Sequence, residues 1–285
     1  MALSHDLGTL TKAFSGLGVD EKSLISILGK WHPEQTKSFR KGSSDFFVED
    51  ERLFERWDDH RLKLLKHEFL RFKNAVVLWT MHPWERDARL IKEALKKGPQ
   101  SYGIIVEVAC SRSSEELLGA RRAYHSLFDH SIEEDVAHHI HGTERKLLVA
   151  LVSAYRYEGQ KVKDDTAKSE AKTLANAFKN ADNKNPIEDD EVDLDGDLRL
   201  KETVQCLCAP HKYFSKVLEA AMRNDADKST SKGLTRVVVT RADTDMKLIK
   251  EEFHSEYGVS LSKKIEDSAH GNYKDFLLTL IARGD

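Results

Sequence analysis

The feature that most constrains this fold is an internal repeat, in which two stretches of the chain match at a constant offset of 129 residues. The match continues without a gap over about forty positions. The matched pairs include Ser111-Arg112 with Thr240-Arg241, Tyr124 with Phe253, Gly142 with Gly271, and Leu147–Val152 with Phe276–Ile281. A fixed offset of this length indicates a protein built from copies of one structural unit.

The residues within each copy follow the spacing of helices. One predicted helix has its apolar side chains three or four positions apart, which is typical of a buried helical face. These side chains are Leu117, Ala120, Tyr124, Leu127 and Phe128. Strand-like alternation with hairpin turns persists nowhere, and the chain has only five prolines. The sequence therefore predicts an all-α protein.

Two further partial copies imply four units in all. The predicted boundaries are residues 1–81, 82–158, 159–208 and 209–285. The third unit is short, because Gly159 and Pro210 are 51 positions apart whereas Pro83 and Gly159 are 76 apart. Residues 180–197 are polar and acidic where apolar helices would lie. Either this unit has lost helices, or a disordered stretch is missing from the sequence.

Composition excludes several classes of function. The formal net charge of -3 provides no global positive field for nucleic acid, and no apolar run approaches the 18 residues of a membrane span. The three cysteines, without a signal peptide, favour reduced thiols and a cytoplasmic protein. Cys110 and Cys206 are interpreted as buried core thiols, with redox sensing as the alternative.

Several stretches resemble the annexins, and those of plants closely. The stretches are Ile105–Arg112, Ala123–Ser126, Ser131–Val136, Arg145–Gly159, Leu78–Ala88 and Leu234–Arg241. The resemblance covers nearly the whole chain except the short third unit. It implies four repeats of five helices packed as a curved disc, with calcium loops on the convex face. It also implies a peripheral protein that docks on anionic phospholipid membranes through Ca²⁺.

The segment from Phe14 to Glu21 looks like the annexin calcium loop. Calcium takes six to eight oxygen ligands, and glycines let a short loop turn its carbonyls inward. The resemblance assigns the carbonyls of Phe14, Gly16 and Gly18 as ligands, and a distant carboxylate for which Glu68 is our choice. Val19 stands where the family usually has Thr, and Glu21 is assigned to a minor adjacent site. Alternatively, the two glycines only cap a helix.

The position of the distant carboxylate departs from the family pattern. Gly18 and Glu68 are 50 residues apart, about ten more than the family spacing, and the extra residues fall within residues 46–59. His67 is the alternative to Glu68.

The corresponding loops of the other units fit calcium less well. In the second unit, Lys97–Ser101 lacks the second glycine, and His139 replaces the acid. The histidines at 138, 139 and 141 suggest either transition-metal ligands or, as we favour, a solvated loop. In the fourth unit, Met222–Lys228 has no glycine and Ser268 takes the acidic position. We interpret this region as a solvated acidic loop. The alternative is that the side chains of Asp225, Asp227 and Asp267 bind calcium.

These observations predict a calcium-dependent phospholipid-binding protein. A loop with three carbonyls and one carboxylate leaves coordination positions for a phosphate oxygen, which couples calcium binding to membrane binding. The alternative is a degenerate annexin that acts as a calcium-independent scaffold for membranes or the cytoskeleton. Actin and other proteins are left open as partners. No catalytic constellation or phosphate-binding motif stands out, so we expect no enzyme activity.

Overall fold

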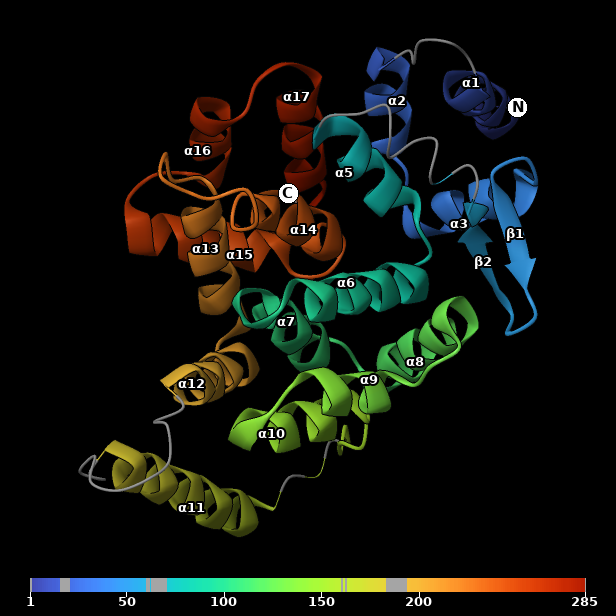
Figure 1. Ribbon diagram of the computed structural model, residues 1–285. Coiled ribbons are helices and arrows are strands. Elements are labelled where there is room, and N and C mark those ends of the chain that lie inside the picture. Colours follow the sequence, from blue (N-terminus) through green and yellow to red (C-terminus); the bar gives the residue numbers. More distant parts are fainter. Residues whose placement is uncertain are drawn as a thin grey trace.

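The computed structural model describes residues 2–15, 21–59, 62, 71–159, 161, 163–182 and 194–284. Helices account for most of these residues (Figure 1). The elements up to residue 101 are α1 (Ala2–Ser15), α2 (Glu21–Leu28), α3 (Pro33–Gly42), β1 (Phe47–Asp50), β2 (Phe54–Trp57), α5 (Arg71–Thr80), α6 (Pro83–Lys97) and the 3₁₀ helix η1 (Pro99–Ser101).

The remaining elements are α7 (Gly103–Ser111), α8 (Ser114–Phe128), α9 (Ile132–His139), α10 (Gly142–Val152), α11 (Asp164–Asp182), α12 (Leu194–Cys208), α13 (Pro210–Ala221), α14 (Lys232–Arg241), α15 (Met246–Tyr257), α16 (Leu261–Ser268), α17 (Gly271–Ile281) and the 3₁₀ helix η2 (Ala282–Gly284). Among the described residues, no helix is both long and apolar enough to cross a bilayer.

The repeat predicted from the sequence is present in the structure. Displacing α9 and α10 by 129 residues reproduces the bounds of α16 and α17. Their starts are also alike, since Ser131 accepts a hydrogen bond from the Glu134 N–H and Ser260 accepts one from the Lys263 N–H. A serine at this position satisfies a backbone donor that has no partner within the helix. The same local chemistry therefore builds both copies.

The helices pack across the predicted unit boundaries. Helix α14 packs against α5, and α17 packs against α2 and α5, which joins the beginning of the chain to its end. Helix α12 packs against α7 and α10 in the same way. The first and fourth units thus form one group of helices, and the second and third units form another. Figure 1 shows the two groups meeting along α6 and α7. The prediction of an all-α repeat fold is confirmed, whereas the boundaries at 81, 158 and 208 stay a prediction.

Buried ion pairs hold the helices together, and one of them joins the second unit to the fourth. The guanidinium of Arg236 in α14 donates to both carboxylate oxygens of Glu107 in α7, at 2.6 and 2.8 Å. Arg112 makes a similar paired contact with Asp87, at 2.7 and 3.0 Å. Paired contacts of this kind fix orientation as well as distance.

A small antiparallel hairpin interrupts the helical pattern, which the expectation of an entirely helical chain missed. It lies within the extra residues at 46–59, where β1 pairs with β2 so that Phe47 faces Trp57. The side chains of Phe47, Phe54 and Trp57 are all buried. The chain reverses at Leu53, which has a φ of 66° and a side chain that is 85% exposed. Four-residue strands are too short for a persistent alternation in the sequence.

The hairpin connects the first unit to the second. The backbone N–H of Trp57 donates to the buried carboxylate of Glu85 in α6, at 3.0 Å. Arg52 donates to the carbonyl oxygen of Arg122 in α8, at 3.1 Å. Since both contacts cross between units, the insertion strengthens an interface and does not merely extend a loop.

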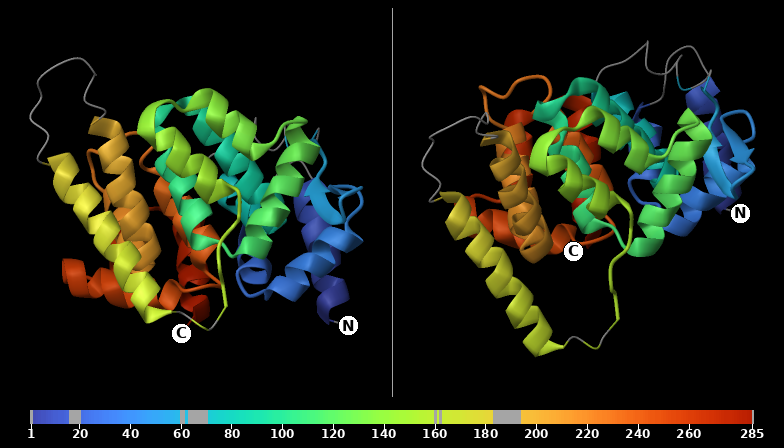
Figure 2. Two further views of the ribbon diagram at one scale, coloured as in Figure 1. Left: turned by 90° about the horizontal axis from the view of Figure 1, so that it is seen from below. Right: turned by 60° about the horizontal axis from the view of Figure 1, so that its bottom comes forward.

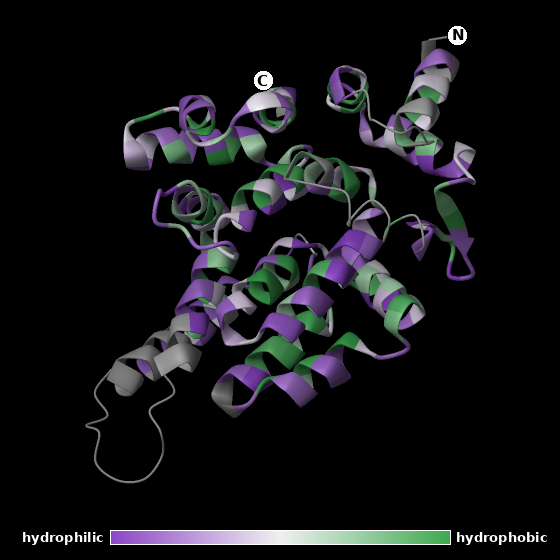
Figure 3. Ribbon diagram, turned by 45° about the horizontal axis from the view of Figure 1, so that its top comes forward, coloured by the Kyte–Doolittle hydropathy of each residue, from purple (hydrophilic) through white to green (hydrophobic). Residues whose placement is uncertain are grey.

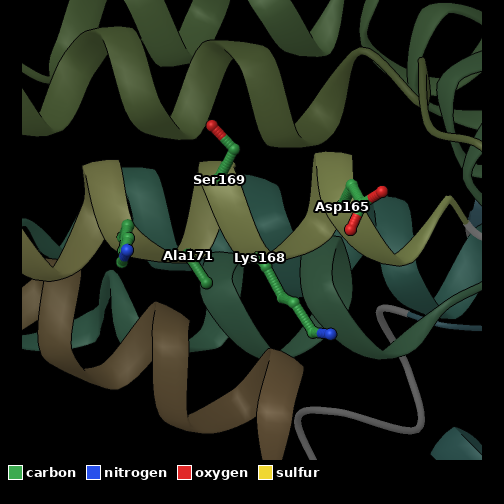
Figure 4. Close-up of a pocket in the computed structure, with 5 residues that line it drawn as sticks. Asp165, Lys168, Ser169 and Ala171 are labelled. Atoms are coloured by element: carbon green, nitrogen blue, oxygen red, sulfur yellow. The ribbon is translucent and has the colours of Figure 1, made fainter.

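The short third unit is represented by two helices. Helix α12 packs into the body of the protein, whereas α11 lies along its edge (Figures 1 and 2). Residues 164–173 of α11 are all exposed. Elsewhere the ribbons carry both hydrophobic and hydrophilic stretches (Figure 3), as expected for helices that bury one face.

Candidate calcium-binding loops

The structure places only part of the predicted first-unit site. Gly16, Gly18, Val19, His67 and Glu68 lie outside the described residues. Phe14 and Glu21 are described, and they lie at the end of α1 and at the start of α2. The two residues therefore flank the predicted loop.

Phe14 anchors the end of α1 in an aromatic cluster. Its ring centroid lies 5.9 Å from that of Phe39, 5.6 Å from that of Phe46 and 5.8 Å from that of Trp57. Phe14 is the penultimate residue of α1, so its carbonyl is among the last four, which lack partners within the helix. The carboxyl end of a helix also carries partial negative charge, which favours a cation.

Glu21 contacts the opposite end of the chain. The side-chain amide of Asn272, in α17, donates a hydrogen bond to the Glu21 carboxylate. Glu21 belongs to the first turn of α2, where an acidic side chain is favoured by the helix dipole. The described contact therefore gives this carboxylate a structural role between α2 and α17.

The second-unit loop is held by contacts within the protein. Gly98 has a φ of 88°, a conformation that favours glycine, and η1 follows it directly. The hydroxyl of Tyr102 donates to the carbonyl oxygen of His139, at 3.0 Å. Tyr102 directly follows the predicted loop at Lys97–Ser101. Its hydrogen bond therefore brings this loop close to His139, the residue at the predicted acidic position.

Arg199 supplies a cation to this same place, although no pattern in the sequence predicts it. Its Nη2 donates to the carbonyl oxygen of Pro99 at 3.0 Å, and its Nε donates to Glu144 at 3.0 Å. Its Nη1 donates to Glu202, one turn along α12. Arg199 and Glu144 are both buried. A loop carbonyl and two carboxylates therefore surround a guanidinium, and the second-unit loop is already bound to a positive charge.

The histidines of the second unit contact one another and the backbone. The rings of His138 and His139 lie 5.1 Å apart, and His139 Nδ1 is 2.8 Å from the carbonyl oxygen of Asp135. Within the described ranges, no group of three or more His, Cys, Asp or Glu side chains is arranged to hold a metal ion. The choice between transition-metal ligands and a solvated loop stays a prediction.

The acids of the fourth-unit loop are engaged by neighbouring groups. Arg223 forms an ion pair with Asp225 at 3.1 Å, and the Thr230 N–H donates to Asp227 at 2.6 Å. Hydrogen bonds from Thr230 lower the pKa of Asp227 below its usual range. Lys263 forms an ion pair with Asp267 at 3.0 Å. Because local donors hold all three carboxylates, the solvated-loop interpretation fits better than a side-chain calcium site.

The two cysteines flagged from the sequence lie together in the core. Cys110 and Cys206 are buried, whereas Cys208 is exposed. The contact between the first two thiols lowers the pKa of Cys110 and raises that of Cys206. Their burial agrees with the interpretation as core thiols.

Known proteins match both the sequence and the fold. The annexin family model matches residues 86–151 and 213–280, which fall inside the predicted second and fourth units. Annexin D4 of Arabidopsis thaliana is 53% identical, with all of both chains covered. Annexin Gh1 of Gossypium hirsutum is 38% identical over 98% of this chain and 95% of its own.

The alignment with annexin D4 also bears on the short third unit. It spans 320 positions, whereas this chain has 285 residues, so 35 positions have no counterpart here. The shortened third unit stays a prediction.

Solved structures support the same assignment at the level of the fold. Annexin III superposes with a TM-score of 0.79 at 23% identity, covering 100% of this chain and 95% of that one. Chicken annexin V superposes with a TM-score of 0.74 at 22% identity, covering 98% and 95%. By its repeat, its helix order and its likeness to the plant proteins, the chain belongs to the annexin family, whose general property is calcium-dependent membrane binding.

Proposed function

We propose that this protein docks on anionic phospholipid membranes through Ca²⁺ held by its first unit. The proposed ligand region comprises Phe14, Gly16, Gly18, Val19, Glu21 and Glu68. The observation that carries the proposal is the position of Phe14 at the carboxyl end of α1, where helix carbonyls lack internal partners. The aromatic cluster around Phe14 holds that end of the helix in place.

The described contacts count against calcium sites in the second and fourth units. The second-unit loop is bound by Arg199, and the fourth-unit acids contact Arg223, Thr230 and Lys263. Calcium would have to displace these groups before it could bind. Among similar folds are calcium-bound annexin (Sm)1 and calcium-bound alpha-14 giardin, whose descriptions name the ion. For this chain, Ca²⁺ is the proposed cofactor.

The mechanism rests on incomplete coordination by the protein. Three carbonyls and one carboxylate supply fewer oxygens than the six to eight that calcium takes, so a lipid phosphate oxygen can complete the shell. Lipid and calcium then strengthen each other's binding by the same factor. The ion also offsets repulsion between an anionic bilayer and a chain of net charge -3.

Co-sedimentation with phosphatidylserine vesicles tests the proposal. We expect the protein to pellet with vesicles in calcium and to stay in the supernatant with a chelator. The Glu68→Gln variant should need at least tenfold more calcium, because it loses a charged ligand. Glu251→Gln is the matched control, since Glu251 is exposed on α15 far from the loop in sequence.

Two outcomes would count against the proposal. Equal pelleting with and without calcium would favour the calcium-independent scaffold instead. An unchanged calcium requirement in Glu68→Gln would remove that residue from the site. Binding to actin, cytoplasmic location and the lack of enzyme activity stay predictions for separate measurement.

A further inference from the structure

A basic cavity lies near the start of α6, at the opposite end of that helix from the second-unit loop. Its volume is about 240 Å³, and four of its lining residues are arginines: Arg40, Arg86, Arg112 and Arg241. They come from α3, from the start of α6 and from the ends of α7 and α14. Hydroxyl groups of Ser111 and Thr240 also line it.

Three of the four guanidinium groups are fixed by carboxylates. Arg112 pairs with Asp87 at 2.7 Å, Arg241 pairs with Asp245 at 2.7 Å, and Arg40 pairs with Glu55 at 3.3 Å. The side chains of these arginines are buried. They form rigid walls of the cavity, with their charges largely balanced.

The two acidic residues of the lining are also engaged. Glu116 accepts a hydrogen bond from the backbone N–H of Ser113 at 2.8 Å, which caps the start of α8. Asp243 pairs with Arg283 at 2.8 Å. Neither lies within ion-pair distance of Arg86.

Arg86 is the exception among the four arginines. Its guanidinium has no ion pair or hydrogen bond within the part of the chain that the structure describes, and its Nε is buried without a partner. Burial, with smaller contributions from Arg112 and Arg40, lowers its pKa to about 10, although Asp87 and Glu116 act in the opposite direction. It therefore remains charged at neutral pH. The Arg86 side chain as a whole is only partly buried, and an anion that enters the cavity would give its buried Nε a hydrogen-bond partner.

We propose that this cavity binds the phosphate group of a small soluble compound, with Arg86 as its principal ligand. A guanidinium presents a planar fork of N–H donors that matches a phosphate oxyanion. The volume accommodates a phosphate and a few further atoms. The hydroxyls of Ser111 and Thr240 donate to carbonyl oxygens of their own helices, so the guanidinium is the principal donor.

The position of the cavity distinguishes a soluble phosphate compound from a lipid headgroup. Arg86 lies near the start of α6, whereas the second-unit loop follows the end of α6. A helix of 15 residues is about 22 Å long. A membrane that contacts the second-unit loop would therefore meet the far end of α6, which favours a soluble compound over a lipid headgroup.

Calcium-free titration calorimetry tests the proposal independently of the calcium loops. Inorganic phosphate and pyrophosphate would be titrated, with a chelator present and ionic strength held constant, into the full chain. We expect one site, and at least tenfold weaker binding in Arg86→Gln. Arg145→Gln is the matched control, since Arg145 is exposed on α10, and it should bind as the unchanged protein does.

A second measurement covers the case in which the variant is altered in its fold. Because Arg86→Gln removes an unpaired charge, its melting temperature without phosphate should not fall. Phosphate should raise the melting temperature of the unchanged protein and not that of the variant. No response of the unchanged protein, or an equal response in both, would overturn the proposal.

A third experiment uses phospholipid vesicles to distinguish a soluble compound from a lipid headgroup. Phosphatidic acid vesicles without calcium should not pellet the protein. Pelleting that is lost in Arg86→Gln would overturn the assignment to a soluble compound and give the site to a lipid headgroup.

Discussion

Arg199 donates to the carbonyl oxygen of Pro99 and to the carboxylate of Glu144, both at 3.0 Å. One residue of α12 thus joins the second-unit loop to the start of α10. The contact places the positive charge of a side chain at that loop. It also links the short third unit to the second.

Removing this guanidinium should destabilise the protein strongly. In Arg199→Met the buried carboxylate of Glu144 loses its ion pair with Arg199, and breaking a buried pair costs about 3–5 kcal/mol. We expect a loss of that order in the free energy of unfolding, measured by urea denaturation. The matched control is Lys212→Met, which breaks an exposed pair with Glu256 and should cost about 1 kcal/mol or less. Equal losses in the two variants would mean that Arg199 is not a structural cation.

The repeat explains why so much of the fold could be predicted. The offset of 129 residues relates α9 to α16 and α10 to α17 because the same caps and apolar spacing occur in both copies. Local rules of this kind are readable from one sequence. The hairpin at 47–57 was not predicted, because its strands are short and its stability comes from burying aromatic side chains against α3 and α6.

The candidate site could be predicted only in part, for a similar reason. Glycines and a carboxylate mark a possible calcium loop, but they do not reveal what the loop meets in space. Arg199 lies 100 positions from Pro99, so no local pattern connects them. The same applies to the cavity around Arg86, which gathers residues from six helices.

Stability should fall on acidification partly through His82. Burial lowers the pKa of His82 from its usual 6.5 to about 3, and its Nδ1 accepts a hydrogen bond from the Trp84 N–H at the start of α6. Below pH 6.5 the unfolded chain binds a proton that the folded protein does not. The contribution of His82 to the free energy of unfolding is therefore fully present above that pH. It declines by up to about 1.4 kcal/mol per pH unit towards pH 3.

His82→Asn isolates this contribution. Asparagine also caps helices well, so the variant should stay folded while losing part of the decline between pH 6.5 and 3. Urea denaturation across this range measures the slope. His141→Asn, at an exposed histidine, should keep the original slope. A slope unchanged in His82→Asn would show that other groups govern the acid response.

The pair between Glu107 and Arg236 should couple the two groups of helices energetically. Both side chains are largely buried, and the contact joins α7 to α14. Glu107→Gln or Arg236→Met alone should cost about 3 kcal/mol or more, because each leaves an unmatched buried group. The double variant should cost clearly less than the sum of the two. Additive costs in this double-mutant cycle would contradict a direct interaction.

The close approach of α8 to α6 depends on Gly119. A Cβ at this position would overlap the indole ring of Trp84, so Gly119→Ala requires the ring or the helix to move. Overpacking of this kind costs about 1–3 kcal/mol.

Gly8→Ala is the matched control, because nothing lies within 4 Å of its added Cβ and the residue lies within α1. Alanine in a helix is favoured over glycine by about 0.5–1 kcal/mol, so this variant should gain stability. Thermal unfolding should therefore shift in opposite directions for the two substitutions, and a shift in the same direction would show that the contact with Trp84 does not limit the packing of these helices.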